Sequence, residues 1–115
     1  MAFAPVENQT DTRAQLQAPT PAEQALWDRY DPDNDYPFLD IGNRYVIKDA
    51  LSSPAVLAGM TWAGVAAALR DPSSSVAQGV DGAANVITAA ICTITGNQPS
   101  AVCSSPTIRE LEARL

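Results

Sequence analysis

One stretch, residues 36–47, carries the only clear β-strand pattern in this chain, with the sequence Tyr-Pro-Phe-Leu-Asp-Ile-Gly-Asn-Arg-Tyr-Val-Ile. Two β-prone runs, residues 37–41 and 44–47, flank the pair Gly42-Asn43. Glycine at the first position of such a pair supplies the positive φ that a two-residue type II′ turn needs. We therefore expect a β-hairpin at about residues 37–48, with Leu39 and Ile41 on the same face of the sheet.

The remainder of the chain predicts helices that could cover this hairpin. Residues 21–30 follow Thr20, a capping residue that has a glutamate three positions later. A short helical turn is expected at Ser53-Pro54. Longer helices are expected at residues 62–70, after the capping residue Thr61, and at 76–94, where apolar residues recur every three or four positions. A final helix follows Ser105 and is rich in charged residues. Trp62 falls on the apolar stripe of its helix, which predicts that it is part of the core.

These patterns indicate one α+β domain that is mostly helical. The chain has 115 residues, which is enough for a single core but leaves little surplus stability. We divide it into residues 1–19, mostly loop with a short extended piece at residues 3–6, then the body at residues 20–104, and a short polar helix at 105–115. Alanine supplies much of the apolar content, so the core is expected to be thin.

Charge and residue usage exclude several classes of function. The net charge of −6 opposes phosphate backbones and anionic lipids, so we expect no nucleic-acid partner. The sequence contains no histidine, which removes histidine-activated nucleophiles and most zinc or iron sites. We assign no catalytic residue, metal or cofactor. Residues 51–69 are uncharged but are interrupted by Pro54 and Gly59, so we expect short buried helices rather than a membrane span.

Asp31, Asp33 and Asp35 alternate as carboxylates do at the start of a calcium-binding loop. The sixth position of that motif is Tyr36 instead of glycine and the twelfth is Gly42 instead of glutamate, so the sharp turn and the bidentate ligand are both missing. We expect a solvated turn in which the aspartates make local hydrogen bonds.

The two cysteines, Cys92 and Cys103, are 11 positions apart across a turn that contains Pro99. That separation leaves enough chain for the sulfur atoms to meet, and a disulfide would restrict the unfolded chain by about 3 kcal/mol. A structural disulfide is the leading interpretation, and two free buried thiols are the alternative. Redox chemistry is disfavoured because no Cys-x-x-Cys motif is present to lower a thiol pKa. Disulfides persist mainly outside the cytosol, although residues 1–9 lack the pattern of a signal peptide.

Several separate motifs resemble the C-terminal part of proteins that carry domain of unknown function 929. They are Phe-Ala-Pro-Val-Glu-Asn-Gln-Thr at residues 3–10, Leu-Gln-Ala-Pro-Thr at 16–20, the hairpin segment at 36–47, Gly-Met-Thr-Trp at 59–62, Asp-Pro-Ser-Ser-Ser at 71–75 and the run from Asp81 to Cys103. Members of that family are similar to thioredoxin-like and DsbA-like proteins. The resemblance implies a partial thioredoxin-like fold over the body of the chain, and relatives that are membrane-anchored or extracytoplasmic.

The resemblance also implies a role for Tyr36 and Pro37. In thioredoxin-like folds a cis-proline opens the strand after the middle helices, and the backbone of the preceding residue meets an extended peptide substrate. Pro37 occupies that place with Tyr36 before it, so both become candidate peptide-binding residues. From the residues alone, an ordinary trans proline at a strand edge is the alternative.

This sequence departs from the family where the relatives carry their chemistry. It contains no Cys-x-x-Cys and no residues that would form the first strand and helix of the fold, and Cys92 and Cys103 match family cysteines that look structural. We therefore expect a non-catalytic, truncated thioredoxin-like domain. The alternatives are a peptide-binding or scaffold module that uses the Tyr36-Pro37 groove, and the C-terminal half of an oxidoreductase that begins upstream. An incomplete sheet further predicts self-association or pairing with a missing N-terminal thioredoxin-like segment.

Overall fold

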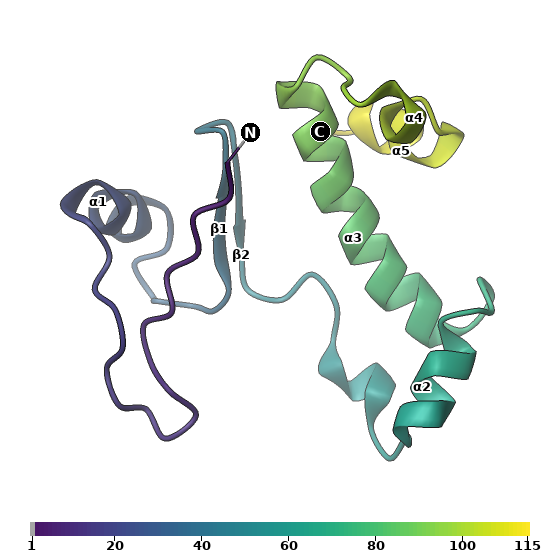
Figure 1. The fold of residues 1–115 in the computed structure, drawn as a ribbon, viewed down its shortest axis with the longest axis horizontal. Helices are drawn as coiled ribbons and strands as arrows, with labels where there is room; N and C mark the ends of the chain where they lie inside the picture. Colours follow the sequence, from purple (N-terminus) through teal and green to yellow (C-terminus); the bar gives the residue numbers. More distant parts are fainter. Residues whose placement is uncertain (1) are drawn as a thin grey trace.

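The computed structural model describes residues 2–115 and has two regions (Figure 1). The N-terminal region, residues 2–48, contains helix α1 (Pro21–Tyr30) and strands β1 (Phe38–Ile41) and β2 (Tyr45–Lys48). The helical region, residues 54–115, contains a 3₁₀ turn, η1 (Pro54–Leu57), and helices α2 (Trp62–Ala68), α3 (Ser75–Ile94), α4 (Ser100–Cys103) and α5 (Pro106–Glu112). The expected α+β, mostly helical fold is confirmed.

Helix α1 begins where its capping signal predicts. The Thr20 hydroxyl accepts a hydrogen bond from the Glu23 backbone N–H, and the Glu23 carboxylate accepts one from the Thr20 backbone N–H at 2.7 Å. This reciprocal pair satisfies two of the amide groups that a helix start leaves without partners. The helix ends at Tyr30, and the N–H of its C-cap residue Asp31 still donates to the Trp27 carbonyl.

The hairpin forms where it was expected, but its turn differs from the prediction. Ile41 pairs with Tyr45, so the loop has three residues, 42–44, and β2 begins one residue later than expected. Both Gly42 and Asn43 have positive φ, whereas a type II′ turn requires it only at the first position. Asn43 tolerates this conformation because its short polar side chain suits the left-handed region, and its N–H donates to the Asp40 carboxylate at 3.1 Å.

Residues 3–6 form no strand, which corrects the expectation of a short extended edge there. The chain instead folds back on itself nearby, with an isolated bridge between Gln9 and Gln15. The Leu16 and Gln17 amides donate to the carbonyls of Asn8 and Glu7, which closes this loop.

Local capping also explains where the later helices begin. The side chains of Ser53, Thr61, Ser74 and Ser105 each accept a hydrogen bond from a backbone N–H in the first turn that follows. Helix α4 was not expected, because its four residues fall in a stretch that the sequence indicates only as a turn. Trp62 contradicts its prediction: its side chain is 93 % exposed, because α2 presents another side to α3.

The main core lies in the helical region, between α3, α4 and α5. The buried cluster consists of Ala89, Cys92, Cys103 and Ile108, with Leu111 packed against it. The C-terminal helix is therefore not simply polar, since Ile108 and Leu111 anchor it. Small residues dominate the most buried positions of α3, namely Ala77, Ala89 and Ala90, which agrees with the expected thin core.

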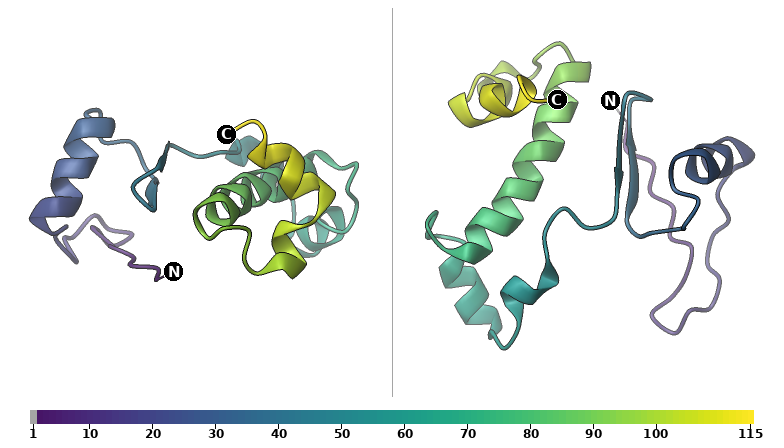
Figure 2. Two further views of the ribbon diagram at one scale, coloured as in Figure 1. Left: turned by 90° about the horizontal axis from the view of Figure 1, so that it is seen from above. Right: turned by 180° about the vertical axis from the view of Figure 1, so that it is seen from behind.

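The two regions lie side by side with the hairpin between α1 and α3 (Figures 1 and 2). The radius of gyration is 16.3 Å, compared with about 13 Å for a compact domain of this length. The hairpin turn approaches the end of α3 at Gly42, where an added Cβ would lie 2.8 Å from Ile94 Cδ1. Much of the hairpin is consequently accessible to other molecules.

Candidate binding site at the hairpin

The outer edges of the hairpin carry unpaired backbone groups. Within residues 2–115, the backbone of β1 hydrogen-bonds only to β2 and to the turn residue Arg44. The backbone of β2 likewise has no partner outside the hairpin in this part of the chain. A sheet of two strands with two free edges can accept a further strand on either side.

Tyr36 and Pro37 lie at the entrance to β1, as their positions in the sequence predict. The Tyr36-Pro37 peptide bond is cis, as is Gln98-Pro99. Tyr36 is 58 % exposed, and its ring meets Trp27 edge to face with 5.3 Å between the ring centroids. Trp27 also stacks on Phe38 at 6.2 Å. Helix α1 therefore holds the start of β1 through one indole ring.

The buried carboxylate of Asp31 completes this aromatic cluster. The Trp27 indole N–H donates to Asp31 Oδ2 at 2.9 Å, and Asp31 is fully buried. Its other oxygen, Oδ1, has no hydrogen-bond partner among residues 2–115. The expected solvated turn is thus wrong for Asp31, although Asp33 and Asp35 are exposed. The spacing of four residues between Trp27 and Asp31 was the available signal, because such pairs meet at a helix end.

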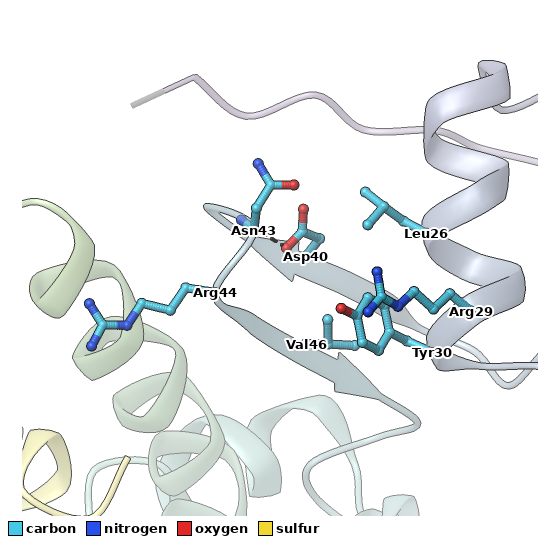
Figure 3. Close-up of a pocket in the computed structure, with 7 residues that line it drawn as sticks. All are labelled: Leu26, Arg29, Tyr30, Asp40, Asn43, Arg44 and Val46. Carbon is cyan, nitrogen blue, oxygen red and sulfur yellow. Dashed lines mark hydrogen bonds between the residues drawn. The ribbon is translucent and has the colours of Figure 1, made fainter.

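A cleft separates α1 from the opposite end of the hairpin (Figure 3). It measures about 460 Å³ and is lined by Leu26, Arg29, Tyr30, Asp40, Asn43, Arg44 and Val46. The side chains of Arg29 and Tyr30 extend from α1 toward Val46, whereas the Arg44 guanidinium points away toward α3 (Figure 3). No sequence pattern indicates this cleft, because its residues come from three separate segments.

The cysteines lie away from both surfaces, in the core of the helical region. Cys92 and Cys103 form a disulfide with a Cα–Cα distance of 5.6 Å, which confirms the leading interpretation of the pair. Each is 1 % exposed. The side-chain amide of Asn97, oriented with its nitrogen toward α5, donates to both carboxylate oxygens of Glu112 at 2.8 and 3.1 Å. Both features join the end of α3 to the last helices.

The resolved pKa shifts belong to caps and turns. The Thr20 backbone N–H, followed by its hydroxyl, lowers the pKa of Glu23 below its ordinary value. The Ser73 hydroxyl and N–H likewise lower the pKa of Asp71. In the part of the chain that the structure describes, no three His, Cys, Asp or Glu side chains gather as metal ligands. No helix among residues 2–115 has the length and apolar character to span a membrane.

Comparisons with protein-family models, with curated proteins and with solved structures find no match for this chain. The resemblance to domain of unknown function 929 and to thioredoxin-like proteins therefore stays a prediction.

Proposed function

We propose that this protein is a non-catalytic binding module, of the truncated thioredoxin-like kind that the resemblance implies, which holds an extended peptide along the free edge of β1. The peptide would add a strand to the hairpin and pass beside Tyr36 and Pro37. The unpaired backbone of β1 is the observation that carries this proposal.

The environment of Tyr36 supports this location. Its ring is more than half exposed, yet it rests against Trp27, which is itself only 8 % exposed. A tyrosine held in this way offers contact area to a ligand at a low cost in conformational entropy. An extended peptide gains main-chain hydrogen bonds from the strand and side-chain contacts from this ring.

The cysteines favour binding over thiol chemistry in this chain. Both sulfur atoms are tied in a disulfide that is almost completely buried, and no other cysteine is present in the sequence. The same strand edge could accept an N-terminal thioredoxin-like segment or a second copy of the chain. The test below is designed to separate these partners from a peptide.

The test begins with a selection from a displayed library of short random peptides. The selected sequence is then synthesised in two further forms, each N-methylated at alternate residues. Successive amides of a strand point to opposite sides, so only one methylated form loses the donors that face β1. We expect that form to bind at least about tenfold more weakly, while the other form retains its affinity.

Two tyrosine substitutions locate the site. Tyr36→Ala should weaken binding about tenfold, whereas Tyr30→Ala, which removes a tyrosine of similar exposure at the separate cleft, should leave it unchanged. Failure to select a peptide, equal binding of the two methylated forms, or equal effects of the two substitutions would reject the proposal. If self-association occupies the edge, the selected peptide should dissociate the oligomer in sedimentation; an oligomer that the peptide leaves intact would also argue against it.

A further inference from the structure

The cleft between α1 and the hairpin brings two opposite charges onto facing walls. Arg29 comes from the last turn of α1, and Asp40 comes from β1 (Figure 3). They do not pair with each other, since the only ion pair among residues 2–115 joins Arg114 to Glu110. Two unpaired charges on opposite walls leave room for a ligand that carries the complementary charges.

The positions of both groups are restrained by contacts within the protein. The Arg29 guanidinium lies 5.1 Å from the centroid of the Tyr30 ring, within the range of a cation–π contact. Asp40 accepts the Asn43 N–H, which uses one acceptor site of the carboxylate and leaves others available. The ligand groups would therefore meet side chains that are already partly restrained.

The remainder of the lining is mixed, with apolar residues beside the polar Asn43. Leu26 and Val46 lie on the walls beside the two charges, and Tyr30 contributes its ring. The second cation of the lining, Arg44, directs its guanidinium away from the cleft and stacks on Tyr45 at 5.6 Å. The cleft consequently offers one positive group, one negative group and an apolar surface between α1 and β2.

From this arrangement we propose that the cleft binds a small zwitterion with an apolar side chain, in chemical terms a free apolar amino acid. Arg29 would hold the carboxylate and Asp40 the ammonium group, while Leu26 and Val46 would contact the side chain. Charge-assisted hydrogen bonds of this kind are stronger than neutral ones. This inference is independent of the peptide site, which uses the edge of β1 and Tyr36.

The experiment is an NMR titration of the full chain with leucine, N-acetyl-leucine and leucine amide. N-acetyl-leucine lacks the ammonium group and leucine amide lacks the carboxylate, so each probe removes one half of the proposed recognition. An open site holds so small a ligand weakly, and concentrations of about 1 mM and above are appropriate. We expect leucine to shift the signals of Leu26 and Val46 and to bind about tenfold more tightly than either derivative.

Two substitutions test the separate roles of the charged groups. Arg29→Gln should weaken leucine binding about tenfold and remove the preference for leucine over leucine amide. Asp40→Asn should remove the preference over N-acetyl-leucine, and asparagine can still accept the Asn43 N–H and preserve the turn. Arg70→Gln is the matched control, because it removes the same charge from an exposed residue outside the cleft and should leave leucine binding unchanged.

Other outcomes would overturn the inference. Equal binding of leucine and its two derivatives would show that the protein does not recognise the ammonium and carboxylate groups of the ligand. An equal effect of Arg29→Gln and Arg70→Gln would show only general electrostatic attraction. An absence of shifts at Leu26 and Val46 would exclude the site. A loss of leucine binding in Tyr36→Ala would place the ligand at the strand edge instead.

Discussion

The two regions of this molecule achieve order by different means. The helical region is fastened by a buried disulfide and by the contact of Asn97 with Glu112, and it encloses the Ala89, Cys92, Cys103 and Ile108 cluster. The N-terminal region has no disulfide, and its most buried contacts gather around Trp27. Its hairpin keeps both edges unpaired within residues 2–115.

This difference separates a supporting part from a binding part. A two-stranded sheet is marginally stable alone and gains from any strand that pairs with it. The helical region has no comparable free edge, because its backbone is satisfied within helices. The free strand edges thus lie in the N-terminal region, which has fewer stabilising contacts and where local unfolding costs less free energy.

The largest effect is expected from Trp27→Ala. Removing this buried ring should destabilise the N-terminal region by about 3–5 kcal/mol, because Tyr36 and Phe38 lose their packing and Asp31 loses its indole donor. Hydrogen exchange should show α1 and β1 unprotected while α3 and α5 stay protected. Trp62→Ala is the matched control: Trp62 is 93 % exposed, so its loss should change stability by less than about 0.5 kcal/mol. Similar effects of the two substitutions would remove the distinction between the regions.

The disulfide provides a matching test of the helical region. Replacing Cys92 and Cys103 together by serine should reduce the stability of the helical region by about 3 kcal/mol, because the unfolded chain regains the entropy of an open loop. Denaturant unfolding of α3 and α5, followed by hydrogen exchange, measures this change. Wild-type protein treated with reductant serves as a control and should match the double variant. An unchanged unfolding curve would mean that the Asn97 and Glu112 contact and the apolar cluster suffice to hold the region.

The smallest expected effect concerns pH and the start of α1. The Thr20 N–H lowers the folded-state pKa of Glu23 below its ordinary value of 4.5. The capping contribution is therefore fully present above pH 4.5 and is lost as the pH falls through the folded-state pKa. The Thr20 amide signal should report this loss in NMR spectra. Glu23→Gln can still close the capping box and should remove the pH dependence, so an identical titration in that variant would contradict the assignment.

Local rules predicted much of this fold because each depends on a few neighbouring residues. The capping residues Thr20, Ser53, Thr61 and Ser105 marked the starts of four helical segments, and the strands appeared where β-prone runs flank a glycine. The disulfide also follows from a short separation along the chain.

Features that depend on distant packing escaped prediction. The apolar stripe of α2 indicated a buried Trp62, but periodicity cannot say which side of a helix finds a partner. The hairpin loop is one residue longer than expected, and Asn43 joins Gly42 in adopting a positive φ there. The cleft could not be foreseen, since Arg29 and Asp40 line the same cleft only after α1 has packed against the hairpin.

The contact between Gly42 and Ile94 has a mechanical consequence. Helix α3 has 20 residues and is therefore about 30 Å long, and Ile94 is its last residue. If α3 pivots about its first turn, Ile94 travels farther than any other residue of the helix. The distance between the hairpin turn and the end of α3 is consequently the most sensitive gauge of rotation between the two regions. Binding at the hairpin that rotates one region against the other would therefore change this distance more than any other along α3.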